Sequence, residues 1–112
     1  MIVESAKINC DNINDWASFH SEFNRVFGFP DFYGNNMNAW IDCMSSIDSQ
    51  DDGMTSIHCK EGAVLTIELD NVRVLKKKHP DLYEAVLEAV AFVNWRRMDV
   101  GEKSVLALAF YA

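Results

Sequence analysis

The chain has 112 residues and a formal net charge of −7, with 49% hydrophobic and 12% aromatic residues. This length and apolar content predict one folded domain over residues 1–112 and argue against disorder. The acidic balance argues against a nucleic-acid-binding protein, because phosphate contacts need Lys and Arg. It favours a basic protein partner, although an acidic surface is equally typical of a protein that merely needs solubility.

The first predicted elements are a strand over residues 3–8 and a helix that ends at Gly28. Asp11 or Asn12 is expected to cap this helix, with Asp15 in its first turn near the positive end of the helix dipole. The helical spacing rests on Ile13, Trp16, Ala17, His20, Phe23 and Phe27.

A turn-rich loop over residues 29–35 leads to a second predicted helix at residues 37–46. Pro30 fixes one backbone angle of the loop, and Gly34 is expected to supply an angle that other residues resist. Asn36 is a suitable cap for the helix. The apolar face of this helix consists of Met37, Trp40, Ile41 and Met44.

A polar loop is predicted for residues 45–53, followed by strands at residues 55–59 and 64–69 that could form a hairpin. Asp70 or Asn71 is then expected to cap a short helix over residues 72–78.

The last predicted elements are a helix over residues 81–97, with Pro80 at its first turn, a loop over residues 98–103 and a strand over residues 105–111. The final apolar run is typical of a strand buried on both faces of a parallel sheet. The order of elements predicts an α/β fold with a small parallel three-stranded sheet packed with helices, and a possible extra hairpin strand.

The polar face of the second helix is the most informative surface in the sequence. Asn38, Asp42 and Ser45 share this face at a spacing of i, i+4, i+7. Phe32, Tyr33, Asn35 and Asn36 lie at the entrance to the helix. A carboxylate among amides and aromatics can fill a cationic pocket, although an ordinary solvated helix face shows the same pattern.

Residues 29–44, which read FPDFYGNNMNAWIDCM, resemble the loop and second helix of the barstar family. The family pattern is a Pro, an acidic residue, two aromatics, Gly, a polar residue, Asn, an apolar residue, Asp, Ala, two apolar residues and Asp. The order of strands and helices on both sides is also similar to the family, so the resemblance covers most of the chain.

The resemblance implies a ribonuclease inhibitor that is not an enzyme and has no cofactor. Members bind small secreted microbial ribonucleases, and the final Asp of the motif, here Asp42, enters the pocket that holds the substrate phosphate. The motif Gly and Asn are Gly34 and Asn36, and an acid on the late helix is matched by Glu88. The predicted contact residues are Phe32, Tyr33, Gly34, Asn35, Asn36, Asn38, Ile41, Asp42, Ser45 and Glu88.

Three positions depart from the family pattern. Phe32 stands where the family has Tyr, Asn38 where it has Asp, and Ile41 where it has Trp. These departures keep open a second hypothesis, in which the chain is a binding or immunity protein for a different basic partner or toxin. Under either hypothesis, we expect a monomer whose Asp42 is exposed and free of the chain's own Lys and Arg.

The cysteines and histidines give a weaker signal. The odd number of cysteines, Cys10, Cys43 and Cys59, argues against a complete disulfide framework, although one pair could oxidise. The ligand spacings of structural zinc sites do not occur, and His20 lies on an apolar helix face. A Cys-dependent enzyme would rest on Cys43, where the neighbouring Asp42 disfavours a thiolate. With no signal peptide or spanning segment in view, we expect a cytoplasmic protein.

Overall fold

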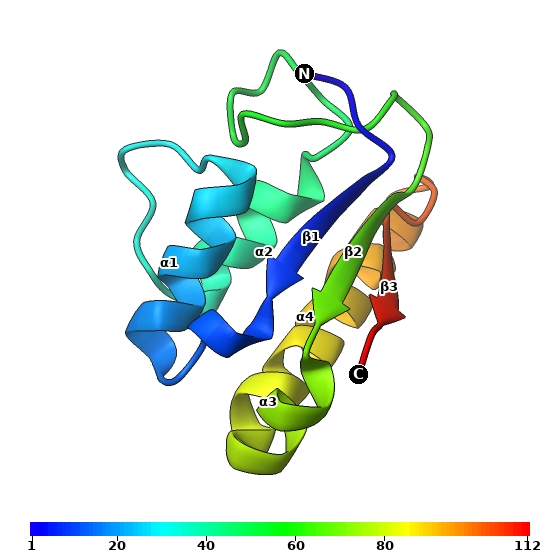
Figure 1. Cartoon of the computed structure of the whole chain (residues 1–112). Helices are drawn as coiled ribbons and strands as arrows, with labels where there is room; N and C mark the ends of the chain where they lie inside the picture. The colour runs from blue at the N-terminus through cyan, green and yellow to red at the C-terminus, as the bar shows by residue number, and fades with distance from the viewer.

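The computed structural model describes all residues from Met1 to Ala112 and contains three strands and four α-helices (Figure 1). The elements follow in the order β1 (Ser5–Asn9), a 3-10 helix (Cys10–Asn12), α1 (Trp16–Phe27), α2 (Met37–Ser45), β2 (Leu65–Asp70), α3 (Val72–Lys78), α4 (Pro80–Asp99) and β3 (Leu106–Phe110). None of the helices has the length and hydropathy needed to cross a membrane.

The sheet is parallel throughout, with β2 in the centre between β1 and β3. Parallel neighbours need long crossovers, and these carry α1 and α2 between β1 and β2, and α3 and α4 between β2 and β3. In Figure 1 the three arrows point the same way, and the helices α1 and α2 lie together beside β1. This arrangement confirms the predicted α/β fold class.

One face of the sheet is packed and the other is more exposed. Alternate residues of β2, namely Leu65, Ile67 and Leu69, are buried, while the residues between them are half-buried. The aromatic side chains of α1 fill the space above this face, and Phe23 meets Trp40 edge-on, with ring centroids 5.5 Å apart. This contact packs α2 against α1.

The predicted strand at residues 55–59 is wrong. This segment makes only an isolated bridge between His58 and Ile2, through hydrogen bonds to Met1 and Val3. A hairpin with β2 cannot form, because both edges of β2 are already hydrogen-bonded to β1 and β3.

The prediction that the last strand is buried on both faces is also wrong. β3 is an edge strand in which Leu106 is buried, Ala107 to Ala109 are half-buried, and Phe110 is 52% exposed. The apolar run reflects its contact with α4 on one face rather than cover on both faces.

Two helix boundaries differ from prediction by two residues or more. Asp15 is itself the cap of α1, in a reciprocal capping box with Ser18, because residues 10–12 form the separate 3-10 helix. α4 continues to Asp99, so the loop predicted at residue 98 begins later.

Candidate functional site

The loop between α1 and α2 is held at its α1 end by hydrogen bonds and by the packing of one aromatic ring on another. Gly28 ends α1 with a positive φ of 63°, and Ser56 Oγ donates to its carbonyl at 2.9 Å. Asn24 Oδ1 accepts from the Phe29 amide at 2.8 Å. The Phe29 ring packs on Tyr33 with centroids 4.4 Å apart. The loop therefore presents a defined shape rather than a flexible chain.

The two neighbouring aromatics of the loop point in different directions. Phe32 is 76% exposed, whereas Tyr33 is buried and its hydroxyl is hydrogen-bonded to His20 Nδ1. Burial raises the pKa of the Tyr33 phenol and lowers the pKa of the His20 imidazole, so both groups stay neutral. The expectation that both aromatics reach an exposed spot is therefore correct only for Phe32, and Tyr33 serves to anchor the loop.

Gly34, Asn35 and Asn36 shape the entrance to α2. Asn36 caps the helix as predicted, because its Oδ1 accepts from the Ala39 amide at 2.8 Å. The left-handed residue is Asn35, with φ 53°, and not Gly34 as expected. A Cβ at Gly34 would lie 2.9 Å from Asn36 Nδ2, so a larger residue there would displace the side chain that caps α2. The Asn36 side chain is thus occupied by the cap, and Asn35 remains exposed.

The outward face of α2 carries the predicted polar residues. Asn38 is exposed, and the side chain of Asp42 is 59% exposed. Ser45 is half-buried and donates its hydroxyl proton to the Ile41 carbonyl at 2.6 Å. Asn38 and Asp42 are therefore the polar side chains of this face that are best exposed to a partner.

The prediction that Asp42 is free of the chain's own Lys and Arg is wrong. Asp42 Oδ1 accepts a hydrogen bond from Nη1 of Arg96, in the last turn of α4, at 3.1 Å. The Arg96 side chain is 43% exposed, so this is a surface ion pair of the kind that contributes roughly 0–1 kcal/mol. The carboxylate is covered in part by the chain's own cation, but it is not tucked into the fold.

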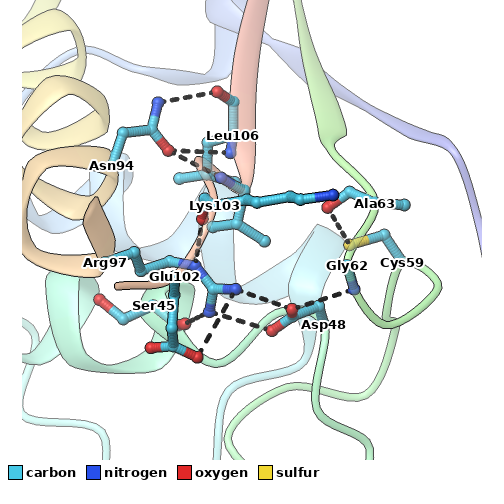
Figure 2. Close-up of polar contacts among 11 residues, drawn as sticks. Ser45, Asp48, Cys59, Gly62, Ala63, Asn94, Arg97, Glu102, Lys103 and Leu106 are labelled. Carbon is cyan, nitrogen blue, oxygen red and sulfur yellow. Dashed lines mark hydrogen bonds and ion pairs between the residues drawn. The ribbon is translucent and has the colours of Figure 1, made fainter. Parts of the chain in front are cut away.

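The next residue, Arg97, fixes the end of α2 to α4 (Figure 2). It is buried and donates from Nη1 to the Ser45 carbonyl at 2.9 Å and from Nε to the Lys103 carbonyl at 2.9 Å. It also forms a two-pronged ion pair with Asp48, at 3.1 and 2.8 Å. These contacts hold the C-terminal end of α2 in place relative to α4.

An apolar groove lies between α2 and α4, next to the outward face of α2. Its volume is about 220 Å³, and Ile41 and Glu88 both line it. The remaining lining residues are Met37, Ala85, Ala89 and Phe92. The structure thus brings Glu88, which was predicted only from the family resemblance, to the same surface as α2.

A second hollow, of about 540 Å³, lies at the C-terminal end of α2 and is wholly polar. Asp51, Asp52, Glu61 and Glu102 line it, together with the Arg97–Asp48 pair. It adds negative charge beside Ser45 without the apolar lining typical of a small-molecule pocket.

The structure gives no support to a nucleophilic thiol. Cys43 is 2% exposed, and burial, followed by the charge of Asp42, raises the pKa of its thiol. All three cysteines are free, and no group of three or more His, Cys, Asp or Glu side chains is arranged to hold a metal ion.

Sequence reasoning missed the contribution of α4 to this surface. Arg96 and Arg97 are explained in sequence by the helix dipole, so no signal connects them to α2. Only the packing of α4 against α2 brings these residues to Asp42 and Ser45.

The parallel three-stranded sheet with one packed face and four α-helices defines a small α/β protein. Residues 3–107 match the family model described as Barstar (barnase inhibitor). The chain therefore belongs to the barstar family, as the resemblance predicted. A comparison with curated proteins found no match.

Proposed function

We propose that the chain inhibits a small basic ribonuclease by covering its active site with the loop–helix surface, defined as residues 32–36, the outward face of α2 and Glu88. The observation that carries the proposal is the exposed Asp42 carboxylate on α2. Hydrogen bonds at both ends of this helix hold it in place. In this proposal Asp42 occupies the cationic cleft that binds the substrate phosphate, because a carboxylate accepts the same hydrogen bonds from Arg, Lys and His.

The surroundings of Asp42 support this role. The Asn36 cap and the Arg97 contacts fix the two ends of α2, so little conformational entropy is lost on binding. Phe32 at the tip of the loop offers an exposed aromatic surface, and the α2–α4 groove adds apolar area beside Glu88. The net charge of −7 favours fast association with a basic enzyme.

Under this proposal the chain has no catalytic activity of its own and acts by steric block. We also propose that it acts in the cytoplasm, since its three cysteines are free and unpaired thiols are typical of a reducing compartment.

The test is inhibition of a panel of small secreted microbial ribonucleases, barnase among them, by the wild type and by Asp42→Asn. If Asp42 is buried against cations in the complex, we expect the variant to raise Kd by about 30-fold or more, which corresponds to roughly 2 kcal/mol. Asp11→Asn is the matched control, because it removes the same charge at a position outside the loop–helix surface. Asp11 lies on the 3-10 helix, which contacts α1 and α3. Equal inhibition by both variants, or no inhibition of any enzyme, would contradict the proposal.

The departures at Phe32, Asn38 and Ile41 favour a second candidate function, in which the same surface neutralises a basic toxin of another kind. Recovery of a non-nuclease basic protein by the wild type, and not by Asp42→Asn, would support this alternative.

A further inference from the structure

We propose that Arg96 is a specificity-determining residue that competes with the partner for Asp42. The inference rests on the proposed function, because it concerns the same carboxylate. In the free protein Arg96 occupies the place that a cation of the ribonuclease would take. A partner binds well only if its own cations displace Arg96 or tolerate it.

The geometry of the contact between Arg96 and Asp42 allows a partner to displace Arg96. One guanidinium nitrogen, Nη1, meets one carboxylate oxygen, Oδ1, at 3.1 Å, and Oδ2 makes no hydrogen bond within the chain. Both side chains are substantially exposed, at 43% for Arg96 and 59% for Asp42. Water and a competing cation can therefore reach the pair, and its rupture costs little.

The backbone next to Arg96 is anchored, which keeps the internal cation near its target. Arg97 is locked to Ser45 and Asp48 by three hydrogen bonds, and this ties the last turn of α4 to the end of α2. Arg96 and Asp42 are 54 positions apart in sequence, yet the anchor holds their backbones within side-chain reach. The local concentration of this cation at Asp42 is consequently high.

The charge of Arg96 acts through Asp42. It neutralises the carboxylate that attracts an incoming basic cleft, and Arg96 must leave this carboxylate before a cation of the cleft can bind there. A cleft with a planar guanidinium that can bind both oxygens of Asp42 outcompetes the single contact of Arg96. A cleft with one mobile lysine does not, so Arg96 disfavours weakly cationic partners.

A double-mutant cycle on the ribonuclease panel tests this inference. Arg96→Gln removes the competing charge, and Arg73→Gln is the matched control, because Arg73 is exposed on α3 and forms no ion pair. Against a ribonuclease that binds the wild type, we expect Arg96→Gln to lower Kd by roughly two- to fivefold, the range of one exposed ion pair. In the Asp42→Asn background, Arg96→Gln should change Kd no more than Arg73→Gln does.

Each other outcome has a defined meaning. Weaker binding by Arg96→Gln overturns the inference, because Arg96 would then orient Asp42 for the partner. An effect equal to that of Arg73→Gln, or one that persists in the Asp42→Asn background, also overturns it, since net charge alone would explain the result. If Asp42→Asn binds like the wild type, or no form binds any enzyme of the panel, the proposed function itself fails.

Discussion

The buried ion pair of Arg97 with Asp48 leads to the sharpest prediction about stability. Both side chains are only 10% exposed, and Arg97 makes four hydrogen bonds that join α4 to the end of α2 and to the loop before β3. Arg97→Met retains most of the side-chain volume and removes the charge. The Asp48 carboxylate, whose side chain is only 10% exposed, is then left with the Gly62 amide at 3.4 Å as its only remaining donor.

The expected loss of unfolding free energy is large. Removing one partner of a buried pair costs about 3–5 kcal/mol, because the other charge stays buried and uncompensated. A domain of this size has about 5–15 kcal/mol in total, so the variant should lose roughly a fifth or more of its stability. Arg96→Met is the natural comparison. It breaks the exposed ion pair between Arg96 and Asp42, so the expected loss of unfolding free energy is about 1 kcal/mol or less.

Urea unfolding followed by tryptophan fluorescence measures both losses, because Trp40 is fully buried in the native protein. A second variant, Asp48→Asn combined with Arg97→Met, should recover part of the loss by removing the uncompensated charge. If Arg97→Met and Arg96→Met lie within about 1 kcal/mol of each other, the role of Arg97 as an anchor is refuted.

Three further predictions concern pH, the loop and the groove. Burial lowers the pKa of His20 below its ordinary 6.5, so the unfolded chain takes up a proton that the folded chain resists. Stability should fall as pH decreases through 6.5, and His20→Gln should flatten this decline in urea titrations at several pH values. Gly34→Ala places a Cβ against the Asn36 cap and should cost about 0.5–2 kcal/mol, with little further loss when it is added to Asn36→Ala. Phe92→Ala, at a 46% exposed position, should hardly change urea unfolding but should weaken ribonuclease binding roughly fivefold by calorimetry; unchanged affinity would exclude the groove from the interface.

The helices were predictable because their signals are local. Helical spacing, the Asn36 cap, Gly28 at the end of α1 and Pro80 at the start of α4 all act within a few residues of the element they define. The exact start of α1 was harder, since Asp11, Asn12 and Asp15 are all suitable caps. Only the folded chain shows that the capping box with Ser18 selects Asp15.

The strand errors have a common cause, which is that strand pairing depends on distant segments. Residues 55–59 have strand-like composition, but β2 offers them no free edge, because the crossovers place β1 and β3 on its two sides. The apolar run of β3 does not report the strand position, since an edge strand packed on a helix and a central strand can have the same composition.

The candidate site also contains some residues related by local signals and others related only by contacts between distant segments. Residues 32–42 could be related to one another from sequence, because a loop and one helix determine their relative positions. Arg96 lies 54 positions beyond Asp42, and its position in the last turn of a helix is fully explained by the dipole. The contact between these two residues depends on how α4 crosses α2. The hydrophobic periodicity of the two helices does not determine this crossing.

The contact with Arg96 also alters how the acidic composition relates to function. A net charge of −7 describes a field that draws a basic protein towards the molecule from any side. Under the proposed function, recognition depends instead on the few charges at the loop–helix surface, where Asn38 replaces one carboxylate of the family pattern and Arg96 neutralises another in part. If the chain acts as proposed, this surface attracts a partner less strongly than the family pattern would and makes a stricter demand on the geometry of the partner's cations. The long-range charge would govern how fast a partner arrives, whereas Asp42 and Arg96 together would decide whether it stays.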